Sequence, residues 1–316
     1  MTLDLGIDAG GSKAAWSARD ATGVERAQGV AAAIQAAAME PSAVALALRA
    51  IVEEASAASG MPVVSVVAGL AGAGLPRVRR AIRDAVAVTF RSGIRFAVVG
   101  DVEVAAATCL ARGEGVAIWA GTGSFAVARA PDGSLHRAGG RGLLLDDRGG
   151  AASIVLAAAR AALESDDSVI GPTQLSSVLA ASFGASRARE LGRVLRDLPA
   201  GELAQRLPLV AESASRGDGV AAAVIADEAG RLADRAVAAT KRASIPQASC
   251  SLNLGGGALT HCVELREALC AALRARGFGC VPAEAPPAVD GAVRLAGAHR
   301  EGRRPLCDWL EDDHAA

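Results

Sequence analysis

The chain contains two copies of one local pattern, in which an apolar strand runs into a glycine-containing turn with a hydroxyl side chain and then into a second apolar strand. The first copy is GIDAGGSKAA at residues 6–15, and the second is AIWAGTGSFA at residues 117–126. Glycine turns of this kind let backbone N–H groups approach a phosphate, because no side chain stands in the way. The repeat therefore favours a duplicated fold in which each half presents one phosphate-binding turn.

The apolar segments around the two turns predict alternating strands and helices. In the first half we expect strands at 3–8, 14–18, 24–30, 63–72 and 95–101, and helices at 41–60, 76–88 and 102–110. The second half is expected to contain strands at 115–120 and 124–129, helices between 153 and 242, a strand at 249–259, a short strand near 279–281 and a helix over 287–300. Strands that are apolar throughout indicate an α/β sheet covered on both faces. The two halves fit a duplicated ribonuclease-H-like fold, with two lobes and a nucleotide in the cleft between them.

Composition narrows the class of partner. The 316 residues carry 33 basic and 34 acidic side chains, which gives no electrostatic reason to expect a nucleic acid or an anionic membrane. We expect no signal peptide, because the strand-like start LDLGIDAG lacks a basic segment followed by an apolar one. Charges also interrupt the alanine-rich runs well before the roughly 20 apolar residues of a membrane span. The six cysteines are far apart in sequence, which argues against a structural zinc or an iron–sulfur cluster. We expect a cytoplasmic two-domain protein that acts on a small molecule.

The first turn carries candidate ligands for phosphate and metal. Asp8 lies at the end of a strand and is followed by Gly10, Gly11, Ser12 and Lys13. A carboxylate beside a phosphate-binding turn suits a contact with Mg²⁺, and the Lys13 side chain can either reach a phosphate or point into solvent. A hairpin with no ligand would have a similar sequence, so this turn alone leaves both interpretations open.

Two further glycine-rich segments extend the same interpretation. The second turn contributes Gly121, Thr122, Gly123 and Ser124. A later apolar strand runs into Gly255, Gly256 and Gly257, which leave room for a flat adenine or ribose against the backbone. Hairpin chemistry can explain one such turn, but three glycine-rich strand ends together favour a site for ATP.

Asp101 is the candidate catalytic base. It follows the apolar strand 95–99, so its carboxylate is expected at the end of the sheet, where it can take the proton of a sugar hydroxyl that attacks the γ-phosphoryl group. The alternative is that Asp101 only caps a helix that begins at Val102. The preceding helix is expected to present a solvated basic face, made of Arg77, Arg79, Arg80 and Arg83.

Over nearly its whole length the chain resembles the BadF/BadG/BcrA/BcrD ATPase-type family, in particular the N-acetylglucosamine and glucosamine kinase branch within the sugar kinase, heat-shock protein and actin superfamily. The motifs that carry the resemblance are GIDAGGSK (6–13) and AGTGSFAVAR (120–129) for the two phosphate turns, LNLGGGAL (252–259) for adenosine, GDVEVAAA (100–107) for the catalytic aspartate, GLAG (69–72), and the helix PPAVDGAVRLA (286–296).

The resemblance implies that Asp101 is the base, that ATP and Mg²⁺ are the cofactors, and that residues 136–150 form the sugar loop. The loop reads HRAGGRGLLLDDRGG here and is similar to RAGGWGPLLGDEGS in the family. The matching positions become substrate-binding residues together with Asp101, and they are Gly139, Gly140, Gly142 and Asp147.

Four positions depart from the family pattern. In the loop, Arg141 replaces a tryptophan, Arg148 replaces a glutamate and Gly150 replaces a serine. Ala33 stands where the family often carries an asparagine that contacts the sugar. Losing an amide and a carboxylate and gaining two guanidinium groups changes which hydroxyls can be hydrogen-bonded. We therefore expect Arg148 to shift the choice of sugar rather than to affect ATP binding.

Together these inferences predict an ATP-dependent amino-sugar kinase that phosphorylates glucosamine or N-acetylglucosamine, at the 6-hydroxyl. The first lobe is expected to comprise residues 1–112 with 287–316, and the second lobe residues 113–286. The resemblance also implies a homodimer. The alternative function is a nucleotide-binding sensor with a degenerate sugar site, which the altered sugar loop alone supports.

Overall fold

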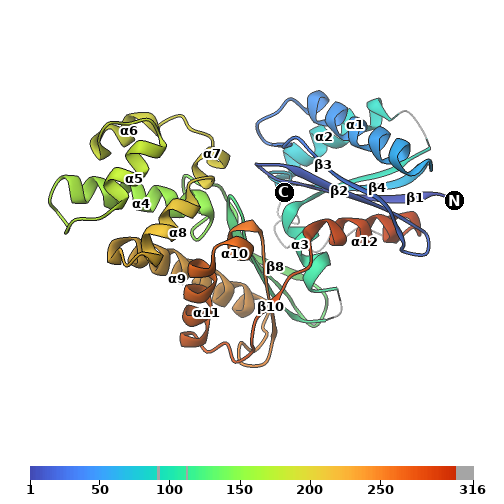
Figure 1. Ribbon diagram of the computed structural model, residues 1–316. Coiled ribbons are helices and arrows are strands. Elements are labelled where there is room, and N and C mark those ends of the chain that lie inside the picture. The colour runs from blue at the N-terminus through green and yellow to red at the C-terminus, as the bar shows by residue number, and fades with distance from the viewer. Residues whose placement is uncertain (91–92, 112, 304–316) are drawn as a thin grey trace. The chain divides into compact units, whose positions relative to one another are not determined.

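The computed structural model describes residues 1–90, 93–111 and 113–303 (Figure 1). The chain divides into two compact units. Unit 1 comprises residues 1–113, 129–136 and 285–316, and unit 2 comprises residues 114–128 and 137–284. Each unit is built around one five-stranded sheet, so the duplication expected from the two glycine turns is present in the architecture.

The sheet of unit 1 has the strand order β3-β2-β1-β4-β5. Its strands are β1 (Leu3–Ala9), β2 (Ala14–Asp20), β3 (Glu25–Ala31), β4 (Val63–Leu70) and β5 (Arg95–Gly100). The first three strands form an antiparallel meander, whereas β1, β4 and β5 run parallel to one another. Parallel strands carry their carboxyl ends to the same edge of a sheet, which is where ligands bind in α/β folds.

Helices cover both faces of this sheet (Figure 1). Successive residues of β4 alternate between two apolar clusters, because side chains on a strand point to opposite faces. Val66 packs with α1 (Pro41–Ser59) and α2 (Pro76–Thr89), whereas Val67 packs with α3 (Asp101–Cys109) and α12 (Ala288–Arg300). A Cβ atom at Gly6 would clash with the backbone of α12, so this glycine is required by the close approach of the C-terminal helix to β1.

The sheet of unit 2 has the order β10-β9-β6-β7-β8. Its strands are β6 (Gly115–Ala120), β7 (Ser124–Arg129), β8 (Leu135–Gly139), β9 (Ser251–Gly255) and β10 (Ala283–Glu284). The short strand predicted near 279–281 lies a few residues further along, as β10, and pairs in parallel with only Asn253 and Leu254. The sequence did not predict β8, because its five residues lack a clear apolar alternation.

The helices of unit 2 fill most of residues 151–275. They are α4 (Ala151–Asp166), α5 (Leu175–Ser182), the 3-10 turn η1 (Ala188–Glu190), α6 (Leu191–Val194), α7 (Ala200–Ala204), α8 (Leu207–Ser215), α9 (Gly219–Arg242), α10 (Gly257–His261) and α11 (Val263–Ala275). The longest of them, α9, packs against β6, α4, α8 and α11. Asp218 caps α9 by accepting hydrogen bonds from the backbone N–H groups of Val220 and Ala221. No helix in the described part of the chain is both long and apolar enough to cross a bilayer.

Candidate functional site

In unit 1, the polar residues predicted for catalysis gather at one edge of the sheet. The register pairs Asp8 of β1 with Gly69 of β4, and Leu70 of β4 with Gly100 of β5. Asp101 is the next residue after β5. Asp8, the loop that follows β4 and Asp101 therefore all lie at the carboxyl edge of the parallel strands, as their strand-end positions in the sequence indicate.

The first glycine turn joins β1 to β2 at this edge. Its backbone is closed by a hydrogen bond from Gly10 N to Lys13 O of 3.0 Å. Gly10 does not adopt a left-handed φ, and a Cβ atom at this position would meet no atom closer than 3.9 Å. Neither conformation nor packing within the protein thus requires glycine at position 10, and the backbone at Gly10 remains open to a ligand. Gln35, which sequence reasoning missed, places its Nε2 atom 3.5 Å from Gly11 O.

The carboxylate of Asp8 is held in an unfavourable environment. Burial raises the pKa of Asp8 to about 6, and the nearby Lys13 ammonium only partly offsets this effect. A bound cation would stabilise the charged form. Mg²⁺ bound together with phosphates needs only one or two protein carboxylates, so Asp8 fits such a site. Within the described residues, no three His, Cys, Asp or Glu side chains form a ready-made metal site.

Asp101 is the first residue of α3 and is partly exposed. The residue at the N-cap position is Gly100, whose conformation is extended and which has no side chain to cap with. Asp101 Oδ1 accepts a hydrogen bond of 3.1 Å from Val102 N. The capping alternative requires a helix that begins at Val102, but α3 begins at Asp101. Asp101 is therefore not the N-cap residue of this helix.

A buried ion pair lies next to Asp101, and it corrects the expectation of a solvated basic face. Arg77, Arg80 and Arg83 are exposed, but Arg79 is 6% exposed and donates to Glu103 Oε1 at 2.9 Å. Glu103 lies in α3, two residues after Asp101, and is fully buried. Arg79 also donates from Nε to Ala73 O at 2.9 Å, so it joins the loop after β4 to α3.

In unit 2, the second glycine turn and the three later glycines meet at the ends of two parallel strands. The register pairs Trp119 of β6 with Gly255 of β9. A Cβ atom at Gly255 would clash with the Trp119 ring, and one at Gly256, whose φ is +93°, would clash with Ala120 O. These two glycines are therefore required by the packing of β9 on β6, whereas Gly257 begins α10 and has no atom closer than 3.9 Å to such a Cβ.

The second turn shares one feature with the first. A Cβ atom at Gly121 would meet nothing within 4 Å, and the φ of Gly121 is not left-handed. Gly10 and Gly121 are the corresponding glycines of the two sequence repeats, and the protein's own structure requires glycine at neither position. Gly123 differs, because a Cβ there would lie 2.6 Å from Asp147 Oδ2. The turn between β6 and β7 is also one residue shorter than the turn between β1 and β2.

The predicted sugar loop owes its glycines to backbone conformation. Gly139, Gly140 and Gly142 have φ values of 86°, 75° and 98°, a region that other residues adopt only with strain. Asp147 has a φ of 57° although it carries a side chain, and strained residues of this kind concentrate at functional sites. Its Oδ1 accepts a hydrogen bond of 3.1 Å from Gly142 N, and burial raises the pKa of its carboxyl group.

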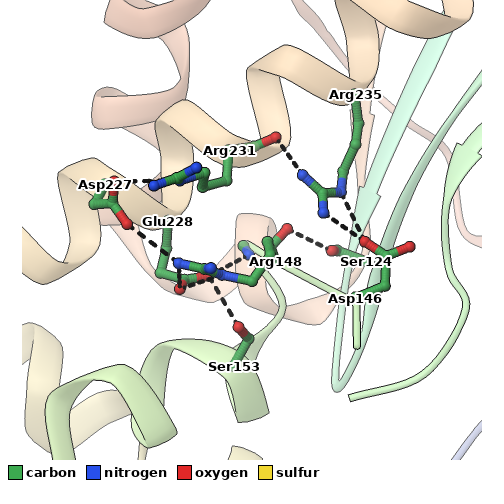
Figure 2. Close-up of polar contacts among 9 residues, drawn as sticks. Ser124, Asp146, Arg148, Ser153, Asp227, Glu228, Arg231 and Arg235 are labelled. Carbon is green, nitrogen blue, oxygen red and sulfur yellow. Dashed lines mark hydrogen bonds and ion pairs between the residues drawn. The ribbon is translucent and has the colours of Figure 1, made fainter. Parts of the chain in front are cut away.

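The residues that depart from the family pattern have different surroundings in the structure. The side chain of Ala33 offers no hydrogen-bonding group, and Arg141 is exposed. The guanidinium of Arg148 contacts Asp227 and Glu228 of α9, and Figure 2 shows these contacts. The Ser124 hydroxyl donates to Arg148 O at 2.7 Å, so the second turn is hydrogen-bonded to the loop. Unit 2 thus brings together the second turn, Asp147 and the segment of Gly255–Gly257.

Comparison with known proteins identifies the family of the chain. The sequence model of the BadF/BadG/BcrA/BcrD ATPase family matches residues 5–293. The chain belongs to this ATPase family. No curated protein sequence matches the chain.

Solved structures of other proteins share the fold of this chain. The structure of a candidate N-acetylglucosamine kinase from Chromobacterium violaceum is 22% identical, with 92% of this chain and 98% of that chain covered and a TM-score of 0.72. A candidate N-acetylglucosamine kinase from Porphyromonas gingivalis is 20% identical, with 94% and 99% covered and a TM-score of 0.72. A ROK family glucokinase from Streptomyces griseus, in complex with glucose and AMPPNP, is 19% identical, with 93% and 99% covered and a TM-score of 0.61. The chain therefore has the actin-like ATPase fold of these sugar kinases.

Proposed function

We propose that this ATPase family member is an ATP-dependent kinase that transfers the γ-phosphoryl group to a hydroxyl of an amino sugar, the 6-hydroxyl of glucosamine or N-acetylglucosamine. The observation that carries the proposal is the pair of open glycines, Gly10 and Gly121. They occupy corresponding turns of the two halves, and neither φ nor packing within the protein requires them. Backbone that is kept open in this way supports the approach of a phosphate.

The nucleotide would be held by three segments. The backbone of the first turn, with Ser12 and Lys13, and the backbone of the second turn, with Thr122 and Ser124, would contact phosphates, and Gly255–Gly257 would pack against adenosine. Mg²⁺ would be held near Asp8 and would neutralise negative charge on the phosphate oxygens. The raised pKa of Asp8 supports this role, because the Lys13 ammonium offsets only part of the cost of burying the carboxylate and a cation would offset more.

Asp101 would act as the general base. As the sugar oxygen forms its bond to the γ-phosphorus, the bond from this phosphorus to the departing oxygen of ADP breaks, and the hydroxyl proton moves to the Asp101 carboxylate. The position of Asp101 at the same sheet edge as Asp8 supports this role. Asp147 and the backbone around Gly139, Gly140 and Gly142 would bind the sugar.

A panel of acceptor sugars tests the proposal directly. Sugar-dependent release of ADP is measured with glucosamine, N-acetylglucosamine, N-acetylmuramate, glucose and mannose. Turnover well above background with an amino sugar supports the kinase. Binding of ADP without turnover on any sugar would instead support the nucleotide-dependent sensor, which the changes at Arg141 and Arg148 in the sugar loop favour.

A further inference from the structure

One buried carboxylate of unit 2 has no part in the mechanism above. Glu228 lies in the middle of α9, on a face that is otherwise formed by apolar residues such as Ile225, Ala229 and Leu232. It is fully buried. A charge is rarely retained in such a position unless its surroundings compensate it, because removing a carboxylate from water costs several kcal/mol.

Every contact of the Glu228 carboxylate leads to one short segment, residues 148–153 (Figure 2). Its Oε1 atom accepts from Nε and Nη2 of Arg148 at 2.7 and 2.6 Å. Its Oε2 atom accepts from Gly149 N at 2.6 Å and from the Ser153 hydroxyl at 3.0 Å. The carboxylate is therefore fully hydrogen-bonded, and it fixes both the end of the sugar loop and the first turn of α4.

The same segment holds the second glycine turn. The Ser124 hydroxyl donates to Arg148 O at 2.7 Å, and the backbone N–H groups of Ala151 and Ala152 donate to Gly121 O and Thr122 O at 2.9 and 3.1 Å. The backbone of Gly150 leaves no room for a Cβ atom, which would lie 2.8 Å from Gly123 Cα. The segment held by α9 is thus joined to the turn by two backbone hydrogen bonds and by one from the Ser124 hydroxyl.

A direct contact with substrate does not explain this pair. Glu228 is inaccessible, and the Arg148 guanidinium, whose side chain is 34% exposed, is bound to Glu228 and to Asp227, the latter at 3.2 Å. A second pair supports the same segment, because Arg235 of α9 donates from Nε to Asp146 Oδ1 at 3.0 Å. The helix therefore holds the loop on both sides of Asp147, which is the loop's candidate substrate ligand.

We propose that Arg148 and Glu228 form a positioning pair that holds the turn Gly121–Ser124 in the conformation that binds a nucleotide phosphate. The inference rests on the proposed function in one respect, which is that this turn contacts phosphate. It revises the expectation that Arg148 acts on the choice of sugar, since the guanidinium is engaged by α9 and the backbone carbonyl of the same residue is engaged by Ser124.

Binding of ADP with Mg²⁺, measured by calorimetry without sugar, tests the pair. Arg148→Met and Glu228→Gln are each expected to weaken ADP binding about tenfold, and the double variant is expected to be no weaker than the worse single variant, because all three remove one shared interaction. Arg148→Lys keeps the charge and one donor, so it is expected to restore binding to within about threefold of the unaltered protein.

A matched control separates positioning from stability. Arg276 pairs with Asp234, also on α9, with an Nε–Oδ1 distance of 2.7 Å, but this pair does not contact the loop. Arg276→Met is expected to leave ADP affinity within about twofold, as for distant and independent sites. Equal ADP affinity in Arg148→Met and the unaltered protein, or strictly additive losses in the double variant, would overturn the proposal.

Hydrogen exchange of residues 121–126 and 146–152, without nucleotide, gives a readout that does not depend on the kinase activity. Exchange is expected to be faster in Arg148→Met and Glu228→Gln and unchanged in Arg276→Met. If the unaltered protein does not bind ADP, the proposed function fails, and the exchange result still decides the positioning role. Unchanged exchange in both Arg148→Met and Glu228→Gln would refute that role.

Discussion

Replacing Asp8 by asparagine is expected to stabilise the protein at neutral pH, because the half-buried carboxylate loses hydration and is costly when charged. The pKa of Asp8 rises from 3.8 to about 6 on folding. Each pKa unit corresponds to about 1.4 kcal/mol, so the charged form costs about 3 kcal/mol relative to the unfolded chain. The Asp8→Asn side chain has nearly the same size and no charge, and it avoids this cost.

The sign of the pH dependence follows from the raised pKa. The folded protein binds the Asp8 proton more tightly than the unfolded chain does, so the contribution of Asp8 to stability falls as pH rises from 3.8 to about 6 and is constant above that range. The advantage of Asp8→Asn is therefore expected to be small at pH 4 and complete at pH 8. The unfolding entropy of about 2.1 cal/mol/K per residue over 316 residues means that about 3 kcal/mol corresponds to a rise in Tm of roughly 4–5 °C.

Urea unfolding of both proteins at several pH values measures the effect. Asp84→Asn, at an exposed position of α2, is the control and is expected to change stability by less than about 0.5 kcal/mol. Adding ADP with Mg²⁺ is expected to remove the advantage of the Asp8→Asn variant, because a bound cation stabilises the carboxylate. A variant that is no more stable than the original at pH 8, or an advantage that does not change with pH, would refute the reasoning.

Two further predictions concern the ion pair beside Asp101 and the glycines of unit 2. Arg79→Met is expected to lower the free energy of unfolding by about 3–5 kcal/mol in urea titrations, because it leaves the buried Glu103 carboxylate uncompensated. Adding Glu103→Gln should recover part of this loss. A loss below about 1 kcal/mol would show that the pair is not buried in solution. Gly121→Ala is expected to keep stability within about 0.5 kcal/mol but to weaken ADP binding about tenfold, whereas Gly256→Ala should cost more than about 1 kcal/mol by thermal unfolding, because of its left-handed φ. Equal ADP affinity in Gly121→Ala and the original would contradict a phosphate contact at that turn.

Local patterns in the sequence were enough to predict most strands and helices. The apolar run over 63–70 and the helix from Pro41 to Gly60 depend on signals that lie within the segment itself, namely apolar periodicity, a proline at the start and a glycine at the end. The β10 strand was misplaced because a two-residue pair leaves no periodic pattern. Its position is decided by where the chain meets β9.

The polar contacts of the site could not be predicted in the same way. Arg79 and Glu103 are 24 residues apart, and Arg148 and Glu228 are 80 apart, so neither pairing has a local signal. Glu228 did leave one trace, because it is a charged residue at helical spacing from Ile225 and Leu232 on an apolar face. A charge in such a place indicates a buried partner, although the sequence does not say which residue the partner is.

The central claim is phosphoryl transfer from ATP to an amino sugar with Asp101 as the base, and the rate of the Asp101→Asn variant tests it most directly. Formation of the phosphorylated sugar and of ADP is measured for both proteins with the best acceptor of the sugar panel, together with ADP affinity and Tm. The kinase mechanism predicts a rate that is about 10²- to 10⁴-fold lower, with ADP affinity and Tm nearly unchanged, because asparagine keeps the shape of the side chain but cannot accept the proton. Near-full turnover by the Asp101→Asn variant would contradict the mechanism.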